Sequence, residues 1–303
     1  MKTVSLTGPP SILLLYARAA APMVPGASLL PFVPGGGGEI PEIELELTGV
    51  KTDPEALASY TKVCGFVLRD HLPVTYPHVL AFPLQMAVMA DGSFPFGAVG
   101  LVHIENRIAQ RRPIAVGEAL TICVRPTKLA PHPKGKTFTL QTVVLSGEEV
   151  VWDETSTFLR RGKPAEFADI TAMREEVRTP PEAGFEALPE DAPASAEWRL
   201  GGDLGRRYAS VSGDRNPIHM HALTAKPLGF PAAIAHGMWT KAHCLAALES
   251  RLPDAFTAEV RFRKPILLPA RVEFASAEAG ESEINFSVRD AKRNQPHLDG
   301  RIK

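Results

Sequence analysis

The sequence predicts an α+β protein that contains two copies of one unit, each an antiparallel sheet wrapped around a single long helix. Two observations support this fold class: the chain repeats itself at long range, and each copy has adjacent strand-like segments with little helix between them. The length of 303 residues suggests about two domains and leaves ample room for a hydrophobic core. We expect the two units to lie side by side and to join their sheets.

The repeat appears as three short matches in the same order. "YTKVCGF" at 60–66 matches "YASVSGD" at 208–214, and "VLAFPLQMAVMA" at 79–90 lies over "AIAHGMWTKAHC" at 233–244. "RRPIAVGEALTI", from residue 111, then lies over "RKPILLPARVEF", from residue 263. The offsets are 148 (208 − 60), 154 (236 − 82) and 152 (263 − 111), so small insertions separate the copies. Three matches in one order indicate an internal duplication.

The chain begins with an arm that has no clear apolar period and ends at the glycine run 35–38. A short apolar stretch in this arm loosely resembles a signal peptide. However, Lys2 is its single charged n-region residue and Arg18 interrupts the apolar run, so we expect no cleaved leader. No run reaches the roughly 18 apolar residues of a membrane-spanning helix.

Apolar periodicity then places the regular elements. Alternation with a period of two predicts strands in both copies, at 136–146, 149–161, 258–268 and 284–291. Apolar residues at three- and four-residue spacings predict a helix over 236–252.

A segment rich in Pro, Ala and Glu separates the two copies and is typical of a linker. The predicted domains are a first unit with its arm (1–161), the linker (162–198) and a second unit (199–303).

Composition narrows the class of protein. The apolar content of 45% and charged content of 22% are typical of a soluble protein. A net charge of −1 and a pI near 6.8 argue against a nucleic-acid binder. The three cysteines, Cys64, Cys123 and Cys244, are widely spaced and form no C-x-x-C motif, so we expect reduced thiols and a cytoplasmic protein. No cofactor is predicted.

The most informative stretch runs from Ser212 to His219 and reads "SGDRNPIH". Its Gly and Pro residues force turns, so the side chains of Asp214 and His219 can converge from a loop. A carboxylate beside an imidazole is a plausible acid–base pair, and Asn216 can orient one partner by hydrogen bonding. The alternative is an Asx turn in which Asp214 caps the following backbone and His219 merely packs.

A second polar feature lies at the start of the predicted helix, where His236 precedes Gly237. Backbone N–H groups at a helix N-terminus are unpaired, and a glycine lets a ligand oxygen approach closely. The first copy serves as an internal comparison, because Phe66 stands at the position of Asp214 and Phe82-Pro83 at that of His236-Gly237. Proline has no N–H to offer an oxyanion, so the second copy is predicted to carry the chemistry.

These residues resemble a known family. "SGDRNPIH" and "AHGM" reproduce the motif of the R-specific enoyl-CoA hydratases and MaoC-like dehydratases, and the whole chain is similar to two-copy 3-hydroxyacyl-thioester dehydratases. The resemblance implies a double hot-dog fold and a hydro-lyase of fatty-acid metabolism that interconverts trans-2-enoyl and (R)-3-hydroxyacyl thioesters. His221 is a departure, since many members have an acid there.

The resemblance also implies roles for individual residues. Asp214 and His219 would hold and polarise the attacking water, and the N–H of Gly237 would bind the thioester oxygen. Ser212, Asn216 and His236 would support them. The first unit would be catalytically degenerate and would accommodate the acyl chain, with Phe66 and Phe82 among its contacts.

Other features give weaker expectations. Four histidines within 219–243 raise the question of a metal, but no acidic or cysteine partner completes a familiar spacing, so no metal site is predicted. Arg263 and Lys264 are expected to contact substrate phosphates, although a solvated strand end explains them equally well. Trp239 is a candidate for the lining of the acyl tunnel, with a core role as the default.

The expected partner is an acyl-CoA or acyl-carrier-protein substrate, with no nucleic acid and no membrane. The expected assembly is a monomer or a homodimer. A thioesterase and a non-catalytic thioester-binding subunit are the alternatives in function.

Overall fold

The computed structural model describes residues 2–20, 39–162, 187–189, 191–280 and 282–303. The first half holds β1 (Lys2–Leu6), α1 (Ile12–Ala20), β2 (Ile43–Val50), α2 (Pro54–Cys64), α3 (Tyr76–Met89), β3 (Val102–Gln110), β4 (Leu120–His132), β5 (Gly135–Ser146) and β6 (Glu149–Arg161). The second half holds β7 (Ala196–Leu200), α5 (Leu204–Ser212), α6 (Pro217–Met220), α7 (Ala222–Ala225), η3 (Lys226–Leu228), α8 (Gly237–Ala247), η4 (Glu249–Arg251), β8 (Phe256–Phe262), β9 (Ala270–Glu278), β10 (Ile284–Asp290) and β11 (Pro296–Ile302).

The described strands form one sheet of 11 strands in the order β1-β2-β4-β5-β6-β3-β8-β11-β10-β9-β7. Every pairing is antiparallel except β1 with β2. The strand order reads the same outward from the centre in both directions, with β3 matching β8 and β2 matching β7. This confirms the expected double unit with joined sheets.

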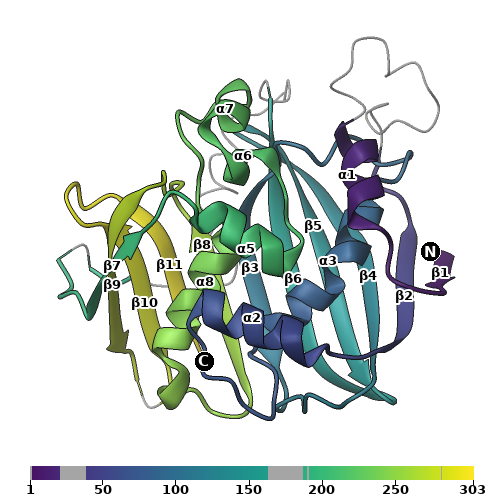
Figure 1. Cartoon of the computed structure of the whole chain (residues 1–303), viewed down its shortest axis with the longest axis horizontal. Helices are drawn as coiled ribbons and strands as arrows, with labels where there is room; N and C mark the ends of the chain where they lie inside the picture. Colours follow the sequence, from purple (N-terminus) through teal and green to yellow (C-terminus); the bar gives the residue numbers. More distant parts are fainter. Residues whose placement is uncertain (1, 21–38, 163–186, 190, 281) are drawn as a thin grey trace.

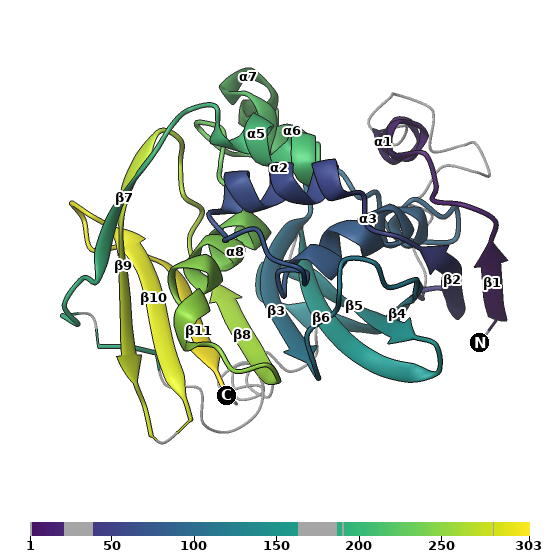
Figure 2. The same cartoon turned by 60° about the horizontal axis from the view of Figure 1, so that its bottom comes forward.

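The sheet curves around two central helices, α3 and α8, which lie on its inner face (Figure 1). Both helices are buried on almost all sides: Leu84 and Val88 of α3 and Ala242 and Leu245 of α8 are fully buried. A helix that is apolar all round belongs in a core, which explains why neither has a strongly polar face. Figure 2 shows α2 lying outside these helices, on the side away from the sheet.

The short repeat "YTKVCGF"/"YASVSGD" has a structural counterpart in α2 and α5. Each helix ends at a glycine in the left-handed region, Gly65 at φ 89° and Gly213 at φ 78°. A left-handed residue closes a helix at little cost only if it lacks a Cβ atom. The tyrosines that open the two motifs, Tyr60 and Tyr208, are buried with ring centroids 6.3 Å apart. The two copies therefore contribute a matched pair of helices.

Two expectations need correction. Pro83 lies inside α3 rather than at its first turn, because the helix already begins at Tyr76 with Pro77 in its first turn. Phe82-Pro83 therefore does not open its helix as His236-Gly237 does, because α3 begins at Tyr76. Most of the predicted linker lies outside the described residues, but residues 196–198 belong to strand β7.

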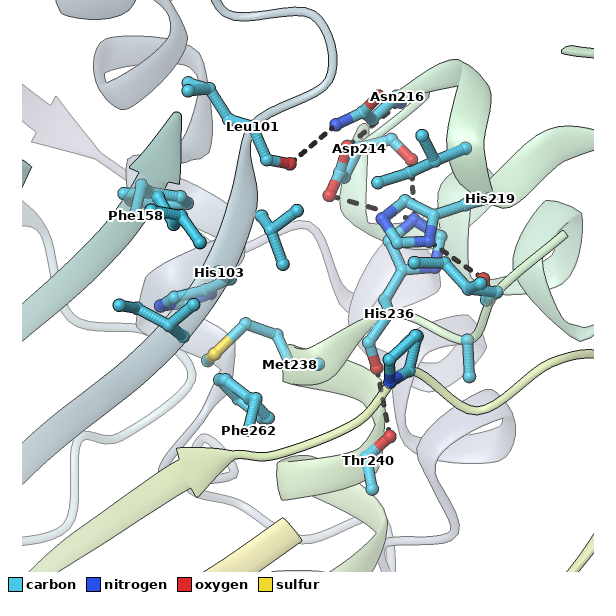
Figure 3. Close-up of a pocket in the computed structure, with 18 of the residues that line it drawn as sticks. Leu101, His103, Phe158, Asp214, Asn216, His219, His236, Met238, Thr240 and Phe262 are labelled. Carbon is cyan, nitrogen blue, oxygen red and sulfur yellow. Dashed lines mark hydrogen bonds and ion pairs between the residues drawn. The ribbon is translucent and has the colours of Figure 1, made fainter. Parts of the chain in front are cut away.

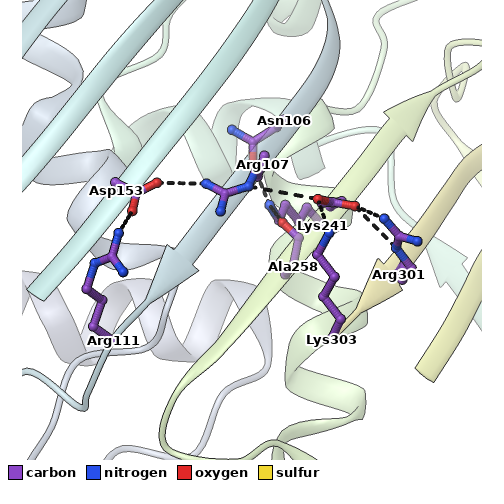
Figure 4. A network of polar contacts seen from close by, with 9 residues as sticks. Asn106, Arg107, Arg111, Asp153, Lys241, Ala258, Arg301 and Lys303 are labelled. Carbon is purple, nitrogen blue, oxygen red and sulfur yellow. Dashed lines mark hydrogen bonds and ion pairs between the residues drawn. The ribbon is translucent and has the colours of Figure 1, made fainter. Parts of the chain in front are cut away.

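The seam between the two halves is the pairing of β3 with β8, where Arg107 lies opposite Glu259. Side chains around the seam form a chain of ion pairs: Arg107 Nη1 lies 2.7 Å from Asp153 Oδ2, and Arg301 Nη2 lies 2.6 Å from Glu259 Oε2 (Figure 4). The Nζ of Lys303 lies 3.1 Å from Glu259 Oε1. Arg107 Nε also lies 3.8 Å from Glu259 Oε1, so a cation of the first half faces an anion of the second across the seam.

A buried polar network also joins the halves. Glu154 of β6 is fully buried and accepts hydrogen bonds from Asn106 and Gln85, and its carboxylate lies 2.9 Å from Nδ1 of His78. Lys241 of α8 is fully buried and donates to Asn106 Oδ1 and to the carbonyl oxygen of Ala258 at 2.9 Å (Figure 4). Desolvation by burial lowers the pKa of Lys241 to about 7.

None of the helices in the described part of the chain is both long and apolar enough to cross a bilayer.

Candidate active site

The site begins where α5 ends. Gly213 turns the chain, and the next residue, Asp214, leaves the helix with its side chain 27% exposed. The hydroxyl of Ser212 donates to the carbonyl oxygen of Tyr208 at 2.9 Å and accepts the N–H of Asp214 at 3.2 Å. Ser212 thus holds the backbone on both sides of the turn.

His219 lies on α6, a single turn that begins at Pro217. This turn packs directly on α5, where a Cβ atom added to Gly205 would lie 2.0 Å from the carbonyl oxygen of His219. The missing side chain at position 205 lets the two helices approach and brings His219 back towards Asp214.

The tautomer of His219 follows from its contacts. Its Nδ1 lies 2.8 Å from the carbonyl oxygen of Ile234, which can only accept a hydrogen bond. Nδ1 therefore carries the proton, and Nε2 has a free lone pair. Burial lowers the pKa of His219 below its ordinary value, against the opposing effect of Asp214. His219 is neutral at neutral pH and can accept a proton at Nε2.

His236 stacks on this ring, with the two centroids 3.6 Å apart. Its Nε2 donates to the backbone oxygen of Asp214 at 3.0 Å. Its Nδ1 is buried and has no hydrogen-bond partner among the described residues. Burial lowers the pKa of His236 to about 3, with a further decrease from His219. His236 therefore packs as a neutral ring beside Asp214 and His219, the pair of residues called the dyad below.

The two carboxylate oxygens of Asp214 have different surroundings. Oδ1 accepts the backbone N–H of Asn216 at 3.1 Å and the hydroxyl of Tyr16 at 2.9 Å. Oδ2 lies 3.8 Å from Nε2 of His236. Burial raises the pKa of Asp214, but the two imidazoles and the two hydrogen bonds outweigh it, so the pKa lies below its ordinary value. Asp214 is ionised at neutral pH.

Asn216 does orient Asp214, but through its backbone. Its side-chain Nδ2 reaches the carbonyl oxygen of Leu101 at 3.5 Å, and its Oδ1 is buried without a partner in the part of the chain that the structure describes. The side-chain amide therefore contacts the first unit rather than the dyad.

Gly237 is the first residue of α8, and His236 is its N-cap. The N–H groups of a first helical turn have no intrahelical acceptor and lie at the positive end of the helix dipole. A Cβ atom at this position would lie 3.0 Å from the ring of Phe262. Without a side chain at position 237, a ligand oxygen has room to reach this N–H beside the Phe262 ring.

One cavity of about 770 Å³ brings these groups together, because Asp214, His219 and Gly237 all line it. Figure 3 shows the dyad on one side and His103, Phe158, Met238 and Phe262 on the other. Residues of the first unit line the cavity as well, namely His78, Phe82, Gln85, Met86, Met89, His103 and Phe158. The cavity therefore runs between the two units.

Of the residues predicted to bind substrate, some line the cavity and others do not. Phe82, Arg263 and Lys264 line the cavity, together with Lys134 and Arg161. Trp239 and Phe66 do not: Trp239 donates from Nε1 to the carbonyl oxygen of Val63 and stacks on His243, so it packs between the helices of the two units. Phe66 lies beside a smaller pocket on another side.

The structure also brings in a residue that the sequence reasoning missed. Tyr16 belongs to the N-terminal arm, for which no structure was expected, yet its hydroxyl contacts Asp214 across 198 residues of chain. The available signal was the spacing of Ile12, Leu15, Tyr16 and Ala19, which gives α1 one apolar face.

Asp214, His219 and His236 have potential ligand atoms within 4.8 Å of one another, as a metal site requires. However, the two imidazoles stack face to face, and each commits one nitrogen to a backbone carbonyl. A carboxylate, a neutral imidazole and a free N–H around one cavity suit proton transfer next to a developing oxyanion.

Comparison with known proteins identifies relatives of this chain. Residues 188–299 match the MaoC-like domain family. The chain is 38% identical over 277 residues to 3-hydroxyacyl-thioester dehydratase X of Mycobacterium tuberculosis, covering 91% of this chain and 94% of that protein. It is 36% identical over 101 residues to 3-hydroxybutyryl-CoA dehydratase of Methylorubrum extorquens, which is 31% of this chain and 64% of that protein.

Solved structures show the same fold. The crystal structure of HtdX of Mycobacterium tuberculosis superposes with a TM-score of 0.73 at 36% identity, over 86% of this chain and 98% of that chain. A second protein of that organism, described as having a double hot-dog fold, superposes with a TM-score of 0.54 at 15% identity, over 84% of this chain and 92% of that chain. The chain therefore belongs to the MaoC-like dehydratase family and has the double hot-dog fold.

Proposed function

We propose that this protein is a hydro-lyase that adds water to a trans-2-enoyl thioester to give the (R)-3-hydroxyacyl thioester, and that it catalyses the reverse dehydration. The observation that carries the proposal is the placing of three groups on one cavity: the carboxylate of Asp214, the ring of His219 and the N–H of Gly237. The names of the dehydratase relatives support the same reaction.

In the hydration direction, water is held between Oδ2 of Asp214 and Nε2 of His219. The dyad accepts a proton from the water as its oxygen attacks C3 of the enoyl group, and the dyad then delivers a proton to C2. The two groups are coupled, so the proton belongs to the pair rather than to one residue.

Charge builds on the thioester oxygen as C3 is attacked. The N–H of Gly237 donates to this oxygen at the positive end of α8, where the dipole favours the enolate over the ground-state carbonyl. A donor of this kind typically contributes about 3 to 4 kcal/mol to lowering the barrier.

The cavity has an end suited to each part of the substrate. Arg263 and Lys264 lie on its wall and are exposed, which suits the phosphates of CoA or of a carrier-protein arm. Arg263 is also paired with Asp299 at 2.9 Å, so Lys264 is the more available cation of the two. Phe82 and the methionines of α3 offer apolar surface to the acyl chain.

The proposal extends to the cellular location and the assembly of the protein. We propose a cytoplasmic enzyme, since Cys64, Cys123 and Cys244 are all free and two of them are buried. The joined sheets already provide the dimer-like arrangement within one chain, so a monomer or a homodimer meets the needs of the site.

The experiment follows the loss of enoyl absorbance with a short and a long trans-2-enoyl-CoA. We expect hydration by the native protein and a fall of about a hundredfold or more in kcat for Asp214→Asn. Asp70→Asn is the matched control, because that side chain is 99% exposed and lies outside the cavity lining.

Other outcomes would contradict the proposal. Release of free thiol in step with the loss of enoyl absorbance would identify a thioesterase, because hydration leaves the thioester bond intact. Thioester binding without turnover of either CoA or carrier-protein substrates would identify a binding subunit.

A further inference from the structure

Helix α1 of the N-terminal arm packs against the catalytic turn. Leu15 and Ala19 of this helix are buried, and Ile12 lies 3.7 Å from the position that a Cβ atom on Gly213 would occupy. Ahead of α1, β1 extends the sheet by pairing in parallel with β2. The arm is thus attached to the fold on both sides of Tyr16, which fixes where its ring can lie.

The hydroxyl of Tyr16 has two partners and one proton. The N–H of Arg215 lies 2.8 Å from the hydroxyl oxygen and can only donate to it. The hydroxyl proton must then point to its other partner, Oδ1 of Asp214, at 2.9 Å. Burial raises the pKa of Tyr16 far above its ordinary value, so the proton stays in place over any practical pH range.

This contact divides the carboxylate into two unequal oxygens. Oδ1 accepts two hydrogen bonds, one from the Tyr16 hydroxyl and one from the backbone N–H of Asn216. Oδ2 is the oxygen left for water or substrate. A carboxylate held through only one backbone bond could rotate about its Cβ–Cγ bond and present either oxygen.

We infer that Tyr16 is a positioning residue of this active site, whose hydroxyl holds Asp214 so that Oδ2 faces the reacting water. The inference rests on the proposed hydration chemistry for its kinetic consequences, while the hydrogen bond itself can be tested without turnover. The arm therefore belongs to the catalytic apparatus, although it lies outside both hot-dog units.

The same contact supports the ionised state of Asp214. The groups facing this carboxylate are His219 on α6, His236 at the start of α8, Tyr208 on α5, and Arg215 with Tyr16. Burial raises the pKa of Asp214, and the two imidazoles lower it. The Asn216 N–H and the Tyr16 hydroxyl lower the pKa further, by smaller amounts. Loss of the hydroxyl removes one donor to the anion, and the pKa rises.

The test is Tyr16→Phe, which keeps the ring and deletes only the hydroxyl. We expect kcat for hydration to fall about tenfold with KM nearly unchanged, because a carboxylate free to rotate holds the reacting water less well. Leu13→Ala is the control, since this α1 side chain is 78% exposed and its loss should leave both quantities as in the native protein.

A double-mutant cycle separates positioning from general damage. Introduced into Asp214→Asn, which lacks the anion, Tyr16→Phe should have almost no further effect on the residual rate. An equal fall in both backgrounds would overturn the inference and leave Tyr16 a packing residue.

A readout without turnover distinguishes this inference from the proposed function. Titration of the Asp214 carboxyl by carbon NMR should give a higher pKa in Tyr16→Phe than in the native protein. If the native protein hydrates no thioester but this shift is present, the proposed function fails and the Tyr16–Asp214 contact stands. If the titrations coincide, the contact fails whatever the activity.

Discussion

Each ring nitrogen of His219 has a separate task. Nδ1 is committed to the carbonyl oxygen of Ile234, which sets the tautomer and the ring orientation, and this leaves Nε2 for chemistry. Asp214 has the same division, with Oδ1 bound and Oδ2 open. In each of these proposed catalytic side chains, one polar atom is therefore structural and the other is left for chemistry.

The active protonation state makes a prediction about pH. Hydration needs ionised Asp214 and neutral His219. The pKa of Asp214 lies below its ordinary value of 3.8, and the pKa of His219 lies below its ordinary value of 6.5. kcat/KM should therefore be level through neutral pH and fall only below about 6.5, as the dyad takes up a proton. A pH–rate profile measured from pH 4.5 to 9 checks this, and an acidic limb centred above pH 7 would contradict it.

At this scale the sequence predicted the site through local spacing. Asp214, Asn216 and His219 lie within six consecutive residues, and Gly237 is marked by the His-Gly-Met segment that opens a helix. Tyr16 could not be found this way, because its contact with Asp214 depends on how the arm crosses the fold. Trp239 was misplaced for a similar reason, since nothing local tells which side of α8 faces the cavity.

Among the elements, the packing of α6 on α5 sets the position of His219. Gly205→Ala would place a Cβ atom 2.0 Å from the carbonyl oxygen of His219, so α6 must move away from α5. We expect a loss of about 1 to 3 kcal/mol in the free energy of unfolding and a clear fall in kcat, because the dyad separates.

Gly202→Ala is the matched control, since its added Cβ atom would meet only the side chain of Pro269, at 4.0 Å. Thermal unfolding and hydration kinetics on the two variants provide the measurement. If the two variants have equal stability and equal kcat, α6 accommodates the added Cβ atom without moving His219, and the prediction is wrong.

The elements differ in how far the sequence predicts them. The strands at 136–146 and 149–161 agree with β5 and β6 to within a residue, because each alternates between a buried and a less buried face. The predicted helix at 236–252 ends as α8 at Ala247, followed by the short turn η4. For α3 the start was misjudged, because its apolar residues continue all round and leave no periodic signal.

Across the whole molecule, Lys241 links the two halves from inside the core. Lys241→Met removes the buried cation that bonds Asn106 and lies near the buried anion Glu154. We expect the free energy of unfolding to fall by about 3 to 5 kcal/mol. Lys303→Met is the control, because this lysine pairs with Glu259 while 42% exposed and should cost at most about 1 kcal/mol.

Denaturant unfolding followed by far-UV circular dichroism and by tryptophan fluorescence measures both variants. The native protein should unfold in one transition, because the network and the seam couple the halves. Two separate transitions in the native protein, or equal losses in the two lysine variants, would refute a coupling through Lys241.

The arrangement of two joined units was predictable, since the three repeat matches occur in the same order. The buried network was not, because its members look unremarkable in sequence. Glu154 lies between Asp153 and Thr155 in β6, on the buried face of the strand with Trp152 and Ser156. The alternation places its side chain inward, but its partners His78, Gln85 and Asn106 come from distant parts of the chain.

The seam has an evolutionary consequence. Arg107 and Glu259 face each other across β3 and β8, and the repeat offset of 152 makes them equivalent residues (107 + 152 = 259), so the pseudo-twofold axis passes between them. In a dimer of identical halves, a residue on the axis meets its own copy, and arginine would face arginine or glutamate face glutamate. Opposite charges at this point require two halves of different sequence, as this chain has. A descendant that shed its first half would bring Glu259 against Glu259, so divergence at the axis works against any return to the unfused ancestor.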